Sequence, residues 1–103
     1  SYGQVFQTKV ISALLTDKSF LQSINDVLSS DFFDNQGLKW IIEEILKYYN
    51  QYNCNISMDV LKIELKKIEN EVLQLSIKEQ LKTASGKKAV ELGTRLQQLQ
   101  RAR

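Results

Sequence analysis

The chain contains no proline and no histidine, and its 103 residues include only four glycines and one cysteine. Proline and glycine are the residues that most strongly disfavour helices, whereas Leu, Lys, Glu and Gln, which fill this sequence, favour them. Strands would instead show β-branched and aromatic residues alternating with polar ones. The composition therefore favours an all-α fold over a β-rich one.

The absence of histidine also limits the chemistry open to the chain. A Ser/His or Cys/His catalytic pair is impossible, and so is a metal site built on two histidines. The single thiol, Cys54, has no second cysteine for an intramolecular disulfide, which fits an intracellular protein. We expect neither an enzyme nor a bound metal or cofactor.

Long apolar runs are missing as well. None reaches the roughly 18 residues that a bilayer-spanning helix needs, and the N-terminus lacks the charged-then-apolar pattern of a signal segment. The hydrophobic fraction of 43% and the charged fraction of 25% are ordinary for a soluble globular domain. We expect a cytoplasmic protein without membrane contact.

Charge is distributed unevenly along the chain. The formal net charge is +2, but residues 1–85 carry nine Lys/Arg against eleven Asp/Glu, whereas residues 86–103 carry five against one. The small residues Ala84, Ser85 and Gly86 are typical of a hinge between the two parts. We predict a helical domain over residues 1–85 and a basic amphipathic tail or linker helix over residues 86–103. The composition of this tail also fits a segment that is foreign to the domain.

Apolar residues at helical spacing predict a compact bundle of about five helices, followed by a C-terminal amphipathic helix. The expected ranges are about 4–16, 18–28, 36–52, 58–69 and 70–83, with the last helix at about 87–101. We expect the helix at 36–52 to be the central one, because its stripe is the clearest: Leu38, Ile41, Ile42, Ile45, Leu46 and Tyr49.

The other helices have weaker stripes. The first is expected to bury Phe6, Val10 and Leu14, and the second Phe20, Ile24, Val27 and Leu28. The fifth is defined by Val72 and Leu75, with Leu73, Ile77 and Leu81 as further candidates. Asp17 and Ser57 stand where N-caps are expected. Of the adjacent aromatics Phe32 and Phe33, we expect one to plug the core.

Two patterns that resemble catalytic or nucleotide sites do not hold up. Gly86-Lys87-Lys88 lacks the first glycine of a phosphate loop, because position 81 is leucine, and it lacks the magnesium-binding Ser/Thr, because position 88 is lysine. Glu43 and Glu44 are consecutive on a helix, so they point about 100° apart and are expected to face water.

Aromatic residues supply the first candidate interface. Trp40, Tyr48 and Tyr52 lie off the centre of the apolar stripe, with Tyr48 and Tyr52 one turn apart and Trp40 two turns before Tyr48. Tyr and Trp are enriched where proteins meet, and they also stack on bases. Nearby carboxylates such as Glu43 oppose phosphate, so contact with another subunit or protein is the favoured interpretation.

The tail supplies two further sets of candidates. Leu92, Leu96 and Leu99 form a stripe that would pack on a neighbouring helix. The tail's basic side chains are candidates for nucleic-acid contact, although a solvated face is the commoner role for charges without interleaved aromatics. These residues are Lys87, Lys88, Arg95, Arg101 and Arg103.

An ordered string of packing motifs runs from residue 4 to about residue 69. It consists of the helix Gln7 to Leu15, Asp17-Lys18-Ser19-Phe20, Val27-Leu28-Ser29-Ser30-Asp31-Phe32-Phe33, the helix around Trp40 to Tyr49, and Tyr52-Asn53-Cys54-Asn55-Ile56-Ser57-Met58-Asp59-Val60-Leu61. In order and spacing this string resembles the N-terminal domain of DnaB-family replicative helicases, closest in style to those of T4-like phages. The proline that the family usually has near Ile56 is missing, and beyond Asn70 the resemblance fades.

The resemblance implies a non-catalytic collar domain. In this family the domain helps the helicase to assemble as a homo-oligomeric ring, and it receives primase or a helicase loader during DNA replication. ATP hydrolysis and DNA translocation belong to a separate motor domain, so contact with DNA would be indirect. The implied location is the cytoplasm of a bacterium or of a phage-infected host.

Two other functions stay open. The helicase-binding domain of a primase has a related helical fold, but the order of Asp31-Phe32-Phe33 before Ile56-Ser57-Met58 favours the helicase. A small nucleic-acid-binding helical protein would instead act through the basic tail. An enzyme is the least favoured class, because no nucleophile, base, metal or cofactor constellation is found.

Overall fold

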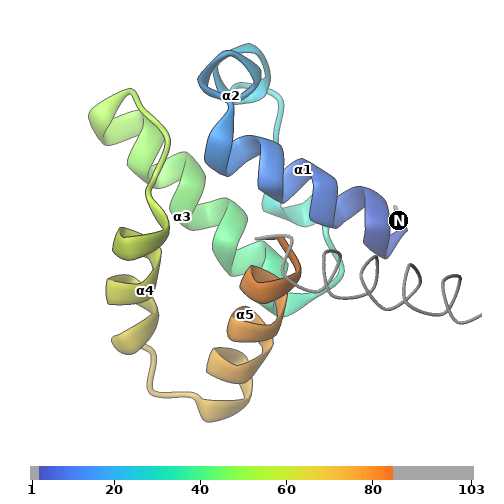
Figure 1. The fold of residues 1–103 in the computed structure, drawn as a ribbon, viewed down its shortest axis with the longest axis vertical. Coiled ribbons are helices and arrows are strands. Elements are labelled where there is room, and N and C mark those ends of the chain that lie inside the picture. Colours follow the sequence, from blue (N-terminus) through green and yellow to red (C-terminus); the bar gives the residue numbers. More distant parts are fainter. Residues whose placement is uncertain (1–2, 85–103) are drawn as a thin grey trace, which may run out of the picture.

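All regular structure in residues 3–84, the part of the chain that the computed structural model describes, is helical. The elements are α1 (Gln4–Thr16), α2 (Lys18–Ile24), the short 3-10 helix η1 (Ser30–Phe32), α3 (Gln36–Tyr52), α4 (Met58–Lys66) and α5 (Glu71–Ala84) (Figure 1). The predicted all-α bundle of about five helices is thereby confirmed. The predicted tail helix at 87–101 lies outside the described residues.

Polar side chains determine where four of the helices begin. In each case a side-chain oxygen accepts a hydrogen bond from the backbone N–H three residues further on, at 3.0–3.2 Å, and so satisfies an amide that the helix leaves without a partner. The pairs are Asp17 with Phe20, Asn35 with Leu38, Ser57 with Val60, and Asn70 with Leu73. The expected caps at Asp17 and Ser57 are confirmed.

Two helices end earlier than their apolar patterns predict. α2 ends at Ile24 rather than near residue 28, because Val27 and Leu28 both donate to the Ile24 carbonyl and form a turn. Val27, assigned to the buried stripe of this helix, is consequently exposed. α4 ends at Lys66 rather than at 69, where the amides of Lys67 and Ile68 form hydrogen bonds to carbonyls three residues back that tighten the last turn.

The core collects around α3, which runs through the middle of the bundle (Figure 1). Its apolar stripe is buried as expected, with contributions from every other α-helix and from Phe33 and Ile56. Phe33 is 4% exposed whereas its neighbour Phe32 is 49% exposed, which confirms that one of the two aromatics fills the core. The fully buried side chains are Ile11, Leu14, Leu21, Leu38, Ile41, Ile42, Ile45, Ile56, Leu61 and Ile77.

The buried faces of α1 and α5 agree only in part with the predicted ones: Leu14 is buried as expected, and of the α5 candidates Ile77 and Leu81 are buried. α1 buries Gln7, Ile11 and Leu14, and Phe6 is exposed. α5 buries Ile77, Leu81 and Ala84, spaced at i, i+4 and i+7, whereas the expected Val72 and Leu75 face outward. Both sequences carry more than one row of apolar residues, and contact with α3 and with each other selects the row that is buried.

α3 and α5 cross at close range near the beginning of α3. Gly37 is buried there, and a Cβ atom on it would lie 2.7 Å from Ser76 Oγ and 2.9 Å from the Ser76 carbonyl carbon. The Ser76 hydroxyl also donates to Asn35 Oδ1 at 3.2 Å, the same oxygen that caps α3. The absence of a side chain at position 37 therefore allows the two backbones to meet.

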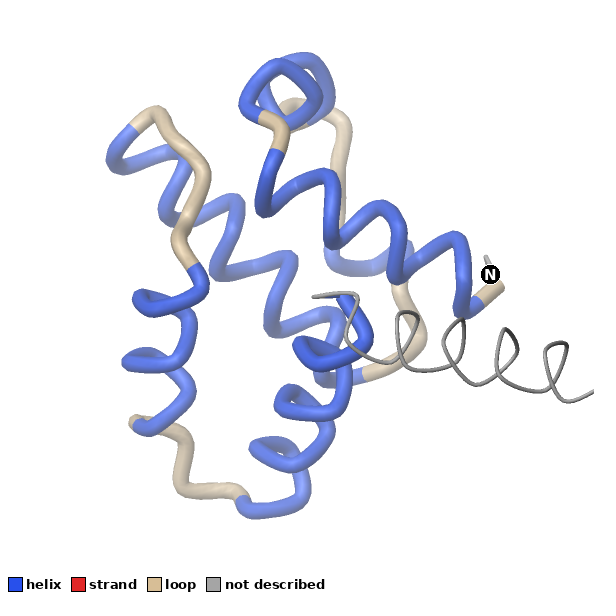
Figure 2. The backbone as a smooth tube through the Cα atoms, in the orientation of Figure 1, coloured by secondary structure: helices blue, strands red, loops and turns tan. Residues whose placement is uncertain are grey.

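α4 is connected to the rest of the bundle through its two loops (Figure 2). The loop before it begins at Asn53, whose left-handed φ of 56° ends α3, and continues to Asn55, whose Nδ2 donates to the Leu14 carbonyl of α1 at 2.7 Å. The loop after it, residues 67–70, turns the chain so that α5 runs back beside α4 in the opposite direction (Figure 1). α4 and α5 thus form an antiparallel pair.

We expect Gly37→Ala to destabilise the protein by about 1–3 kcal/mol, the usual cost of forcing atoms into a filled site. The clash involves the backbone of Ser76, so it should outweigh the roughly 1 kcal/mol that alanine contributes over glycine in a helix. Urea unfolding measures the difference. Gly3→Ala is the matched control, because nothing lies within 4 Å of a Cβ at that position. An equally stable Gly37→Ala variant would disprove the close crossing.

Candidate functional site

The aromatic residues singled out from the sequence lie along one line of α3. Trp40, Glu44, Tyr48 and Tyr52 follow one another at four-residue spacing, and the Tyr48 and Tyr52 rings are 4.5 Å apart between centroids, tilted by 47°. Trp40 and Tyr48 are half-buried and pack against the core, whereas Tyr52 is 56% exposed. The exposed end of this line is therefore at Tyr52.

A shallow hollow of about 180 Å³ adjoins the two tyrosines. One wall comes from the second half of α3, and the other from the 53–57 loop and α4. The lining residues are Glu44, Lys47, Tyr48, Gln51, Tyr52, Ile56, Val60 and Glu64, which we call the tyrosine surface. Trp40 is not among them, so the structure joins two of the three predicted interface residues at one hollow.

Glu44 is a charged group in an unusual environment. Burial raises its pKa above the ordinary value, and Glu64 and Glu43 add repulsion in the same direction, while Lys47 opposes them by attraction. Glu43 is exposed and accepts a hydrogen bond from Ser30 Oγ at 3.2 Å. The expectation that both carboxylates face water is thus met by Glu43, whereas Glu44 is half-buried.

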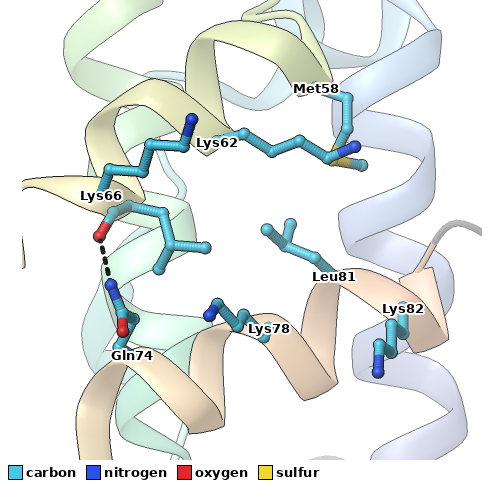
Figure 3. Close-up of a pocket in the computed structure, with 8 residues that line it drawn as sticks. Met58, Lys62, Lys66, Gln74, Lys78, Leu81 and Lys82 are labelled. Atoms are coloured by element: carbon cyan, nitrogen blue, oxygen red, sulfur yellow. Dashed lines mark hydrogen bonds between the residues drawn. The ribbon is translucent and has the colours of Figure 1, made fainter. Parts of the chain in front are cut away.

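A larger hollow, which sequence reasoning missed, lies between α4 and α5 (Figure 3). Its volume is about 480 Å³, and its surface is mostly apolar. The lining residues are Met58, Lys62, Leu65 and Lys66 from α4, and Gln74, Lys78, Leu81 and Lys82 from α5. We call this hollow the lysine groove.

The two walls of the lysine groove carry the same pattern. On each helix the lining residues stand at i, i+4, i+7 and i+8, which places them on one face. The shared part is Lys-x-x-Leu-Lys, at residues 62–66 and again at residues 78–82. This repeat is visible in the sequence, but lysines on a helix usually mean a solvated face, and nothing local shows that the two copies face one another.

Leucine forms the floor of the groove and lysine its rim. Leu65 and Leu81 are 5% and 6% exposed, whereas the four lysines are exposed. Figure 3 shows Lys62 and Lys66 coming from one helix and Lys78 and Lys82 from the other. Gln74 Nε2 donates to the Leu65 carbonyl at 3.3 Å and links the walls near the 67–70 loop. The result is an apolar strip framed by positive charge.

The charge of this rim is not neutralised by the groove itself. Among residues 3–84, none of those lining the groove is acidic. Within the same range, Lys62, Lys66 and Lys78 form no ion pair, whereas Lys67 on another face of α4 pairs with Glu64 at 3.1 Å. The groove therefore presents three ammonium groups without a carboxylate partner in the described domain.

The remaining predicted residues lie outside the described part of the chain. These are the leucines Leu92, Leu96 and Leu99 and the basic residues Lys87, Lys88, Arg95, Arg101 and Arg103. Within residues 3–84 no three His, Cys, Asp or Glu side chains gather as a metal site would require. None of the helices in this range has the length and apolar character that crossing a bilayer demands.

Comparison with known proteins adds no family assignment. No protein-family model matches the chain, and no curated protein or solved structure shows significant similarity to it. The resemblance to the helicase domain therefore stays a prediction from the residue pattern.

The raised pKa of Glu44 predicts how stability depends on pH. In the folded protein the pKa of Glu44 lies above its ordinary value of 4.5, so the folded state binds the proton more tightly than the unfolded state does. Folding stability therefore falls as pH rises from the ordinary pKa through the raised pKa of the folded state, because Glu44 then becomes charged while partly buried. Glu44→Gln cannot ionise, so it does not lose stability in this way as pH rises. The variant should gain stability relative to the wild type between about pH 4 and about pH 7 in urea unfolding.

A direct measurement is the NMR titration of the Glu44 carboxyl carbon. Glu64→Gln provides the control, because removing this nearby negative charge should lower the pKa of Glu44 towards its ordinary value. A Glu44 titration at or below 4.5 in the wild type would contradict the burial described here.

Proposed function

We propose that the chain is a non-catalytic protein-interaction domain, corresponding to the N-terminal collar domain of a DnaB-type replicative helicase. In this role it self-associates and binds primase or a helicase loader during DNA replication, and it meets DNA only indirectly. The observation that supports this best is the tyrosine surface, where an exposed aromatic side chain adjoins a hollow on the central helix.

The tyrosine surface has the physical character of a protein interface. Tyr52 offers a large ring with few rotatable bonds, so little side-chain entropy is lost when a partner covers it. Its ring contacts that of Tyr48, which packs against the core and holds it in place. Val60, which is partly exposed, adds apolar contact area beside it. A rigid, exposed aromatic side chain beside a hollow is typical of interaction hot spots.

The order of elements agrees with the family resemblance. Asp31 and Phe32 lie in η1 and Phe33 follows it, so the Asp-Phe-Phe motif links α2 to α3 and buries Phe33 in the core. The segment around Ile56 and Ser57 forms the loop that starts α4. Phe33 and Ile56 of these segments pack in the core, which supports the proposal.

The charge around the tyrosine surface favours a protein partner over nucleic acid. Glu44 and Glu64 line its hollow and would repel phosphate, while Lys47 is the basic residue there. The residues proposed for direct DNA contact are those of the tail, outside the described domain. Protein binding is therefore the function that this geometry supports.

We expect Tyr52→Ser to weaken self-association about tenfold, since removing an aromatic hot spot commonly costs more than 1 kcal/mol of binding energy. Ile63→Ser is the matched control, because Ile63 is equally exposed at 56% and lies away from the tyrosine surface. Exposed positions tolerate such changes within about 0.5 kcal/mol of folding stability, so both variants should fold. Sedimentation over a concentration series gives the association constants.

Retention of the cognate primase or helicase loader on the immobilised chain tests the second part of the function. Both variants should be compared with the wild type in this assay. A chain that stays monomeric at every concentration and retains neither protein would refute the helicase assignment.

A further inference from the structure

We propose that the lysine groove is the docking site for an acidic amphipathic helix of a partner protein. This goes beyond the proposed function, because it concerns a different surface and a partner of defined chemistry. It rests on the shape of the groove, on the repeat in its walls and on its charge.

The shape fits a helix. Two antiparallel helices form the walls, with Met58 on one and Leu81 on the other (Figure 3). Leu81 and Leu65, which are largely buried, form the apolar floor between the walls. Helix-in-groove recognition needs this arrangement, in which the apolar face of an incoming helix covers an apolar strip. Methionine suits such a strip because its flexible, polarisable side chain adapts to different apolar shapes. The volume of about 480 Å³ accommodates several side chains of such a helix.

The spacing of the lysines matches helical periodicity. Lys62 and Lys66 are one turn apart on one wall, and Lys78 and Lys82 are one turn apart on the other. Four residues of helix rise about 6 Å, so glutamates at i and i+4 on an incoming helix have the same separation. A helix with leucines on one face and glutamates on both flanks would therefore place carboxylates near the ammonium groups of both walls.

The charge of the groove opposes binding of the basic tail, residues 86–103, in it. Residues 86–103 carry five basic residues and one acidic residue, so their leucine stripe would enter a lysine-rimmed groove against repulsion. Residues 1–85 carry a small acidic excess, but the acidic residues of α4 and α5 do not line the groove. Neither this tail nor the acidic residues of α4 and α5 supply the opposite charge, so we assign it to a partner protein.

Nucleic acid and single-chain lipids fit less well. Among residues 3–84 the groove has no aromatic side chain on which a base would stack and no arginine, and its leucine floor would gain nothing from phosphate. A fatty acid would fill the floor, but its single carboxylate would leave most of the rim without a partner. An acidic helix satisfies the floor and both walls together.

The test uses the full chain and a synthetic peptide of about 18 residues, which is long enough for about five helical turns. The peptide carries leucines on one face and glutamates at i and i+4 on both flanks, with a fluorescent label at one end. A second peptide has the same composition in an order that forms no apolar face. Fluorescence anisotropy gives the affinities, and amide chemical shifts locate the binding site.

We expect the patterned peptide to bind, to shift amides of α4 and α5, and to weaken as salt is raised. The double variant Lys62→Glu with Lys78→Glu should weaken binding about tenfold or more, because each change removes an attraction and adds a repulsion. Lys9→Glu with Lys18→Glu is the matched control, with the same change of net charge at exposed lysines of α1 and α2. This control should keep nearly full affinity.

Several results would overturn the proposal. They are equal binding of the two peptides, equal losses in the two double variants, no binding at millimolar peptide, or displacement of the peptide by single-stranded DNA or by oleate. A second copy of the chain is a further alternative occupant, because exposed Phe32 lies between the exposed residues Asp31 and Asp34. Loss of self-association in Lys62→Glu with Lys78→Glu would identify that occupant and reject a separate partner.

The outcome is distinguishable from that of the proposed function. Tyr52→Ser changes the tyrosine surface and should leave peptide binding intact, since Tyr52 does not line the lysine groove. The groove variants should in turn leave self-association intact. Either function can therefore fail while the other holds.

Discussion

The close crossing of α3 and α5 at Gly37 is the constraint on which the arrangement of the bundle depends. Position 37 has no side chain, so the backbone of Ser76 lies where a Cβ atom would otherwise stand. Asn35 joins the same contact by accepting both from the α3 amide of Leu38 and from the Ser76 hydroxyl. One oxygen thus starts the central helix and fixes α5 against it, and the buried face of α5 follows from that position.

The lysine groove is a consequence of this arrangement. α5 is held by α3 and α1, whereas α4 is held by its buried leucines and by the Asn55 hydrogen bond that anchors its preceding loop to α1. α4 and α5 are joined directly at one end, through the 67–70 loop and the hydrogen bond from Gln74 to Leu65. Because each helix is fixed mainly by other elements, the pair does not close over its own leucines. The groove between them therefore stays open above the largely buried Leu65 and Leu81.

Features that depend on residues close together in the sequence could be predicted, whereas features that depend on residues far apart in the sequence could not. The central helix and the caps at Asp17 and Ser57 were predictable, because periodicity and a hydrogen bond three residues away are local properties. For α5 the sequence offered two apolar rows, one with Val72 and one with Ile77, and only packing on α3 decides between them. Of the tyrosine surface, the aromatic wall was predictable and the opposing wall was not. The lysine groove depends on two helices facing each other, which no local pattern reveals.

α4 is the wall that the tyrosine surface and the lysine groove share. Val60 and Glu64 line the first, and Met58, Lys62 and Leu65 line the second. The two sides of this helix differ in charge, since Glu64 adds to the negative charge of Glu44 on one side, whereas lysine alone supplies the charged groups on the other. A surface repels partners of its own sign as effectively as it attracts the opposite sign. An acidic helix of a partner is therefore attracted to the lysine groove and repelled by the tyrosine surface. In this way α4 can keep the partners of its two sides apart.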